Sequence, residues 1–282
     1  MSASPPPIQA FFLPTPIGQR FCLYHAPTLN KIDADLGSIV HVHAFAEEMN
    51  KCRRMAAMQA RALAGLGYGV LQIDLYGCGD SSGDFADARW DIWKSDIVAG
   101  LNWLQQKHSK SLNLWGDRLG ALLAMDVVRE RREQINKLML WQPVFSGEQF
   151  MTQFFRLLLA NEMVSGKEQS VSGTKQIRAM LEAGETIEIA GYEIAADLAK
   201  QIDSLNAQDW LLPAGQLHWL EISNNAQNEL APARQLIADT WRQLGNSLQV
   251  HRLSGSAFWL AQETIIAPEW LNASCAIFAG AE

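Results

Sequence analysis

The stretch Leu112-Asn113-Leu114-Trp115-Gly116-Asp117-Arg118-Leu119-Gly120-Ala121-Leu122-Leu123-Ala124 joins a short apolar run to a helical pattern almost directly. Leu112–Trp115 predicts a buried strand, and Leu119–Arg132 predicts a helix. Small residues at Gly116 and Gly120, on either side of the turn, would let the two backbones pack closely. The stretch therefore predicts a strand, a sharp turn and a helix in immediate succession.

The turn Gly116-Asp117-Arg118-Leu119-Gly120 matches the pattern Gly-x-Ser-x-Gly at both glycines. That pattern is typical of a nucleophile elbow, which displays a catalytic serine on a strained bend. Here the central residue is Arg118, and a protonated guanidinium has no lone pair with which to attack an acyl carbon. A frame with Asp117 at the apex would place the large residues Trp115 and Leu119 where small ones are needed, so we do not favour it.

Length and composition limit the classes to which this protein can belong. The 282 residues, 48% of them hydrophobic, suffice for one large α/β domain or two small ones. A net charge of −7 argues against nucleic acid as a partner. The N-terminus shows no secretory signal and no run approaches the ~18 apolar residues of a membrane span, so we expect a cytoplasmic protein with no transmembrane segment.

The cysteines and histidines show no spacing that would hold a metal. Four scattered cysteines without a CxxC pair are read as free thiols in a reducing compartment: Cys22, Cys52, Cys78 and Cys275. His41 and His43 alternate in direction along a predicted strand, so both cannot face one ion. We therefore expect neither a metal nor a cofactor.

Strand and helix patterns alternate along the chain. The predicted strands are Ile8–Leu13, Gln19–His25, Ser38–His43, Gly69–Asp74, Leu112–Trp115, Lys137–Trp141, Leu217–Ser223 and Leu248–Leu253. The predicted helices between and after them are Arg53–Leu66, with Asn50 as its N-cap, Trp90–Lys107, Leu119–Arg132, Ala231–Leu244 and one from Pro268 to about Phe278. This rhythm predicts a mostly parallel sheet with helices on both faces.

The rhythm is interrupted after the sixth predicted strand. Residues 144–210 are expected to form a small cap insertion within a single domain spanning residues 1–282. The insertion should contain helices at Gly147–Val164, Thr174–Glu182 and Ala195–Leu205, and a hairpin at Thr186–Ile194. Its aromatic cluster of Phe150, Phe154 and Phe155 has helical spacing, which favours core packing over an acyl pocket.

Three turns follow one another in an ordered set. His43-Ala44-Phe45-Ala46 matches a His-Gly-x-Gly oxyanion turn, Asp74-Leu75-Tyr76-Gly77-Cys78-Gly79-Asp80-Ser81 matches Asp-x-x-Gly-x-Gly-x-Ser, and the Arg118 turn comes next. With these turns the chain resembles the α/β-hydrolase superfamily over nearly its whole length. The resemblance implies the α/β-hydrolase fold.

Two longer stretches give a more particular resemblance. Residues 45–54 and 71–85, together with Phe258-Trp259-Leu260-Ala261-Gln262-Glu263, resemble the second type of exosortase A system-associated hydrolase. Proteins of that type are encoded beside the machinery that sorts PEP-CTERM proteins and makes exopolysaccharide. The resemblance implies an association with that machinery, and the family label implies an ester or thioester hydrolase.

The three positions of a Ser-His-Asp triad all depart from the pattern. Arg118 stands at the nucleophile, and the loop after the last strand, residues 253–259, contains no histidine. His251 comes too early, inside the strand, where a packed or hydrogen-bonded histidine is expected. Residues 223–228 offer amides for the acid, and Glu229 is the first carboxylate. Cys78 and Ser81 are read as turn residues rather than nucleophiles.

An arginine at the apex demands an anionic partner, because an unpaired buried charge is costly. The candidates are Glu47, Glu48 and Glu263. One hypothesis is a structural ion pair in a vestigial pocket. Another is an anionic or acyl ligand held by Arg118 beneath the cap, with His43, Phe45 and Phe258 as further wall residues. The expected function is a non-catalytic or anion-binding accessory protein, and hydrolysis by an unrecognised constellation is the alternative.

Overall fold

The computed structural model describes residues 8–28, 36–107, 111–131, 135–165, 173–223 and 229–279. Within them an eight-stranded sheet runs in the order β1-β2-β4-β3-β5-β6-β9-β10. The strands are β1 (Gln9–Pro14), β2 (Gln19–His25), β3 (Ser38–Val42), β4 (Gly69–Ile73), β5 (Leu112–Asp117), β6 (Ile135–Trp141), β9 (Ala214–Ile222) and β10 (Leu248–Leu253). β2 pairs antiparallel with β1 and β4, and the other neighbours run parallel, so the predicted mostly parallel sheet is confirmed.

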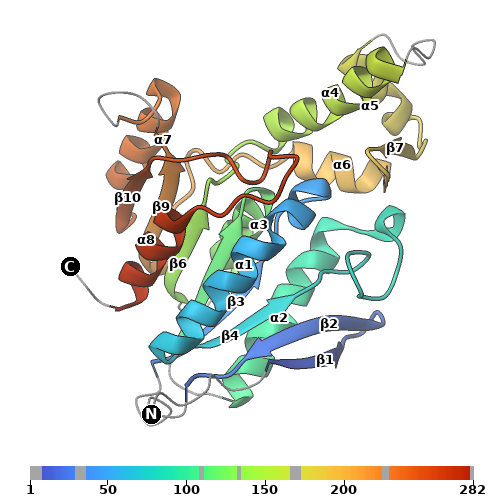
Figure 1. Ribbon diagram of the computed structural model, residues 1–282. Helices are drawn as coiled ribbons and strands as arrows, with labels where there is room; N and C mark the ends of the chain where they lie inside the picture. The colour runs from blue at the N-terminus through green and yellow to red at the C-terminus, as the bar shows by residue number, and fades with distance from the viewer. Residues whose placement is uncertain are drawn as a thin grey trace.

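Helices cover both faces of the sheet (Figure 1). On one face α1 (Glu47–Leu66) and α8 (Pro268–Ala279) pack over buried strand residues that include Trp115 and Trp141. On the other lie α2 (Trp90–Lys107), α3 (Leu119–Glu130) and α7 (Pro232–Gln243), which share a second core with Leu114. Because successive strand side chains point to opposite faces, the neighbours Leu114 and Trp115 serve different cores. No helix in the described ranges is long and apolar enough to cross a membrane.

Five elements lie between β6 and β9 and stand beyond the carboxyl ends of the parallel strands (Figure 1). They are α4 (Gly147–Ser165), α5 (Thr174–Glu182), β7 (Ile187–Ile189), β8 (Tyr192–Ile194) and α6 (Ala196–Asp203). Phe150 and Phe154 of α4 pack edge-on against Phe45, with ring centroids 5.6 and 5.1 Å apart. The predicted core role of these aromatics is confirmed, and the interpretation of residues 144–210 as a cap stays a prediction.

The start of α1 differs from the predicted helix Arg53–Leu66. The helix begins at Glu47, because the chain turns sharply at Ala46 (φ 50°, ψ −127°) and leads directly into the first turn. Asn50 is therefore not the N-cap but lies inside the helix, where its amide donates to Glu47 at 3.3 Å and to the Tyr192 hydroxyl at 3.0 Å. The early start brings Glu47 and Glu48 to the helix N-terminus, where negative charge is favourable.

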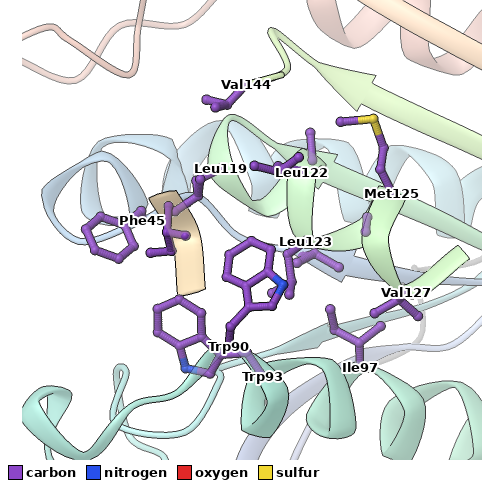
Figure 2. Close-up of a cluster of buried hydrophobic side chains, with 14 of the residues drawn as sticks. Phe45, Trp90, Trp93, Ile97, Leu119, Leu122, Leu123, Met125, Val127 and Val144 are labelled. Atoms are coloured by element: carbon purple, nitrogen blue, oxygen red, sulfur yellow. The ribbon is translucent and has the colours of Figure 1, made fainter. Parts of the chain in front are cut away.

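The start of α3 is anchored in a buried apolar cluster (Figure 2). Figure 2 shows Trp90 and Trp93 of α2 lying beneath Leu119 and Leu123 of α3, with Phe45 beside them. All five side chains are at most 4% exposed. Close packing of this kind fixes the position of the turn between β5 and α3, since large rings leave little room for α3 to shift.

Candidate functional site

Arg118 occupies the apex of the turn between β5 and α3, with φ 55° and ψ −116°. A side chain at Gly116 would lie 2.6 Å from the Cα atom of Ala121, and one at Gly120 would overlap the carbonyl oxygen of His43. Both glycines are therefore required by close backbone approach. The Arg118 amide donates to the Trp141 carbonyl at 2.9 Å, which holds the strained turn against the end of β6.

The Arg118 guanidinium is held on three sides. Its Nε lies 3.3 Å from both carboxylate oxygens of Glu48, and its Nη1 donates to the Gln142 carbonyl at 3.1 Å. Its central carbon, Cζ, lies 5.3 Å from the ring centroid of Trp259, which is a cation–π contact. Burial raises the pKa of Glu48, and the charge of Arg118 opposes that rise. The resulting ion pair is shielded from most of the solvent, since the Arg118 side chain is only 13% exposed.

Of the three predicted partners, the structure brings only Glu48 to Arg118 among the described residues. Glu47 instead accepts from Asn50, and Glu263 is exposed on the segment after β10. The early start of α1 explains the choice, because Glu48 lies in its first turn.

A second arginine and carboxylate lie beside this pair, and neither residue was predicted from the sequence as part of a site. Glu221, near the end of β9, accepts from the Trp219 indole at 2.7 Å and from the Gln142 side-chain amide at 2.9 Å. Arg234 of α7 places Nε 3.4 Å from Glu221 and donates from Nη1 to the Pro143 carbonyl at 3.0 Å. Burial raises the pKa of Glu221, and Arg234 opposes that rise. Glu221 shares β9 with the polar residues Gln216 and His218, so its carboxylate alone was no signal of a site.

Arg118 and Arg234 open onto one cavity of about 300 Å³ between the apex turn, α4 and α7. Its lining combines the two cations with amide and apolar side chains. The residues are Arg118, Val144, Phe145, Ser146, Gln149, Phe150, Gln153, Gln208, Ala233, Arg234, Leu236 and Ile237. Guanidinium and amide donors beside apolar walls suit a small polar anion.

The remaining predicted wall residues lie elsewhere. His43 donates from Nδ1 to the Ala44 carbonyl at 2.7 Å and accepts at Nε2 from the Leu75 amide at 3.2 Å, so both ring nitrogens are engaged with backbone. Burial lowers its pKa, which keeps the ring neutral. Phe45 packs against α4, and Phe258 packs against Trp141 on the face covered by α1 and α8.

Each of the five histidines in the described part of the chain has a hydrogen-bond partner that is not a serine or cysteine. His25 bonds Gln72 at 2.9 Å, His41 bonds Asp117 at 2.9 Å, and His43 bonds backbone. His251 lies inside β10 and faces His218 at 3.1 Å, which confirms its predicted role as a hydrogen-bonded strand histidine. The sixth histidine, residue 108, is outside the described residues. None of these contacts joins an imidazole to a serine or cysteine.

The two residues considered as other nucleophiles serve the turn after β4. Ser81 donates to the Asp74 carbonyl at 2.5 Å and accepts from the Phe21 amide at 2.8 Å. Gly77 and Gly79 have φ values of 72° and 55°. Burial raises the pKa of the Cys78 thiol far above its usual range, which disfavours the nucleophilic thiolate. The predicted turn role is confirmed, while positions 224–228, the expected place of a triad acid, lie outside the described residues.

Comparison with known proteins places this architecture in the α/β-hydrolase fold. The chain belongs to the serine aminopeptidase S33 family, whose model matches residues 34–190. No protein of curated function matches the sequence.

Solved structures with this fold cover nearly the whole chain. Est1E from Butyrivibrio proteoclasticus with bound ferulic acid is 14% identical, with a TM-score of 0.63 over 96% of this chain and 97% of that one. A putative hydrolase from Agrobacterium vitis S4 is 14% identical, with a TM-score of 0.61 over 98% and 99%. A proline iminopeptidase from Mycobacterium smegmatis is also 14% identical, with a TM-score of 0.57 over 96% and 98%. The predicted α/β-hydrolase fold is confirmed. Sequence identities this low show a shared fold and do not show a shared activity.

Proposed function

We propose that this protein binds a small anion at Arg118, which stands where hydrolases of this fold carry their nucleophile, and that it does not use a Ser-His-Asp mechanism. The observation that supports the proposal is Arg118 itself, which stands at the apex of the turn and lines a cavity of about 300 Å³. Such a group binds carboxylate or phosphate through planar N–H donors and offers no electron pair for covalent catalysis.

Arg118 has donor capacity left after its own contacts are counted. Nε faces Glu48 and Nη1 faces the Gln142 carbonyl, whereas Nη2 meets no acceptor among the described residues. An anion in the cavity would provide one. The fixed neighbours reduce the entropy lost on binding, because the guanidinium is already oriented.

Trp259 also argues against the ordinary mechanism. It comes from the segment after β10, where the fold's catalytic histidine is expected, and its ring covers the Arg118 guanidinium at 5.3 Å. A tryptophan indole donates a hydrogen bond but cannot act as a general base.

Substitution of Arg118 tests the proposal. In Arg118→Gln we expect acetate and sulfate affinity, measured by calorimetric titration, to fall at least tenfold, which corresponds to about 1.4 kcal/mol or more. Because Glu48 would lose its partner, the matched variant Arg118→Gln with Glu48→Gln separates loss of binding from loss of stability. Wild-type affinity in both variants would exclude Arg118 as the anion site.

An ester, thioester or amide hydrolase is the second candidate, and the match to the serine aminopeptidase family favours it. The two functions differ in turnover of p-nitrophenyl acetate. The binding proposal expects no rate above background in the wild type. It expects none in Arg118→Ser either, because a serine alone lacks a base. Saturable turnover by the wild type would establish the hydrolase instead.

We propose further that the protein acts in the cytoplasm beside the exosortase A and exopolysaccharide machinery. This rests on the sequence resemblance of residues 45–54, 71–85 and 258–263 to the exosortase-associated type. Deletion of the gene is expected to alter exopolysaccharide output or the sorting of PEP-CTERM proteins, and an unchanged phenotype in both assays would count against the association.

A further inference from the structure

We infer that Arg118 and Arg234 form a two-arginine clamp for a small dianion of the phosphomonoester type, carried on a hydroxylated body. The inference rests on the proposed function and adds to it a second binding residue and the charge class of the ligand. It follows from how the two guanidiniums are held, what they face and what surrounds the space between them.

The two guanidiniums are tied to consecutive peptide groups. Nη1 of Arg118 donates to the Gln142 carbonyl at 3.1 Å, and Nη1 of Arg234 donates to the Pro143 carbonyl at 3.0 Å. Consecutive carbonyls lie within a few ångströms of each other, so a side chain from the apex turn and one from α7 approach the same short segment after β6. Both then line the same cavity.

The two side chains are also held in the same way. Each presents Nε to a buried carboxylate, Arg118 to Glu48 at 3.3 Å and Arg234 to Glu221 at 3.4 Å. Each lies over an aromatic ring, Arg118 over Trp259 at 5.3 Å and Arg234 over Phe145 at 5.0 Å. In both, Nη2 meets no acceptor among the described residues. Two oriented donors therefore remain for one ligand.

The charges favour a dianion over a monoanion. The pKa of Arg234 is lowered, chiefly by burial; the charge of Glu221 opposes this effect, and the charge of Arg118 adds to it because the two cations repel each other. Water screens this repulsion poorly, because the two side chains are only 13% and 25% exposed, and the carboxylates of Glu48 and Glu221 offset part of it. An anion between them relieves the repulsion, and one with two charges and several oxygens can accept from both arginines at once.

The rest of the cavity indicates the body of the ligand. Gln149 and Gln153, one turn apart on α4, and Gln208 bring three amides to the lining. An amide both donates and accepts, which suits hydroxyl groups. A volume of about 300 Å³ lies at the lower end of the range for ligand pockets, so the body is small.

The test compares anions of different charge on the whole protein. Sulfate, glycerol 3-phosphate and acetate are titrated calorimetrically at constant ionic strength. We expect both dianions to bind at least tenfold more tightly than acetate, and glycerol 3-phosphate to bind more tightly than sulfate. In Arg234→Gln the affinity for both dianions should fall at least tenfold, to about that for acetate.

Two further variants keep the test decisive. Arg129→Gln is the matched control, because Arg129 is also ion-paired, with Asp126, and lies over Trp210 at 4.1 Å, yet is not among the residues that line this cavity. Its dianion affinity should equal that of the wild type. If Arg234→Gln fails to fold, Arg234→Gln with Glu221→Gln removes the ion pair as a unit and is expected to show the same tenfold loss.

The outcomes separate this inference from the proposed function. If Arg118→Gln abolishes binding while the Arg234 variants bind dianions as the wild type does, the clamp is wrong and the anion site at Arg118 stands. Equal affinity for acetate and the dianions also refutes the clamp. If the wild type binds none of the three anions, both proposals are wrong.

Discussion

Nε2 of His41 lies 2.9 Å from Oδ2 of Asp117, the residue immediately before Arg118. Both side chains are almost fully buried, and the His41 ring also packs against Trp115 at 4.1 Å between centroids. The contact joins the ends of β3 and β5 on the face of the sheet opposite α3. It therefore fixes the position of Asp117, the residue at which β5 ends and after which the strained apex turn begins.

Replacing Asp117 with Ala should destabilise the protein strongly. The variant leaves the His41 ring buried without its acceptor, and leaving a buried hydrogen-bonding group unpaired costs about 1–3 kcal/mol. Urea unfolding followed by circular dichroism measures the loss. The double variant Asp117→Ala with His41→Ala should lose less than the sum of the two single variants, and strict additivity would show that the contact contributes nothing.

Gly120→Ala should be more damaging than its small size suggests. The added methyl group would overlap the backbone carbonyls of His43 and Val42, and neither carbonyl can move without shifting β3. We expect a loss of at least about 3 kcal/mol or no folded protein. Gly65→Ala is the matched control: it lies in α1 with nothing within 4 Å of the new carbon, so it should stabilise by about 0.5–1 kcal/mol. Similar behaviour of the two variants would contradict the close approach at Gly120.

Much of the apex turn could be predicted because its causes are local. Two glycines at fixed spacing, an apolar run before them and a helical pattern after them determine the bend, whatever the rest of the chain does. The need of Arg118 for a carboxylate follows from elementary electrostatics. The choice among Glu47, Glu48 and Glu263 depended on the turn at Ala46, where a non-glycine residue with φ 50° starts α1 six residues before the periodic pattern indicates.

Arg234 and Glu221 could not be predicted as site residues, because only the topology brings them to Arg118. β9 pairs with β6 only after the chain has passed through α4, α5 and α6, and α7 then follows β9 on the face of the sheet that α3 also covers. Nothing near either residue marks a site. A cluster assembled from separate elements in this way becomes visible only when the order of strands is known.

Glu48→Gln should strengthen sulfate binding and change its pH dependence. Burial raises the pKa of Glu48, so protonation on acidification removes the carboxylate that competes for Arg118. In the wild type sulfate affinity should therefore rise as pH falls through that pKa, and sulfate itself does not titrate in this range. In the variant this part of the rise should disappear and affinity at pH 7 should be several-fold higher. Identical pH profiles of sulfate affinity for the two proteins would show that Glu48 does not affect sulfate binding.

His218 should make the protein less stable in acid. Its pKa is lowered from 6.5 to about 4, chiefly by burial, with the charges of His251 and Lys137 adding to the effect. Above pH 6.5 the ring is neutral in both the folded and the unfolded chain and has no effect on the pH dependence. Between pH 6.5 and about 4 only the unfolded chain takes up the proton, so stability falls as pH falls, by up to roughly 3 kcal/mol.

The variant His218→Asn isolates this contribution. It lacks the titrating ring, so its free energy of unfolding should fall less than that of the wild type between pH 7.5 and 4.5, by roughly 2 kcal/mol. Because His25 and His43 titrate in both proteins, their effects cancel in the comparison. At pH 7.5 the variant should be less stable by about 1 kcal/mol, since the 3.1 Å contact with His251 is weakened. If the stability curves of the wild type and the variant are parallel across the whole pH range, the folded and unfolded chains protonate His218 equally. That result would contradict the prediction.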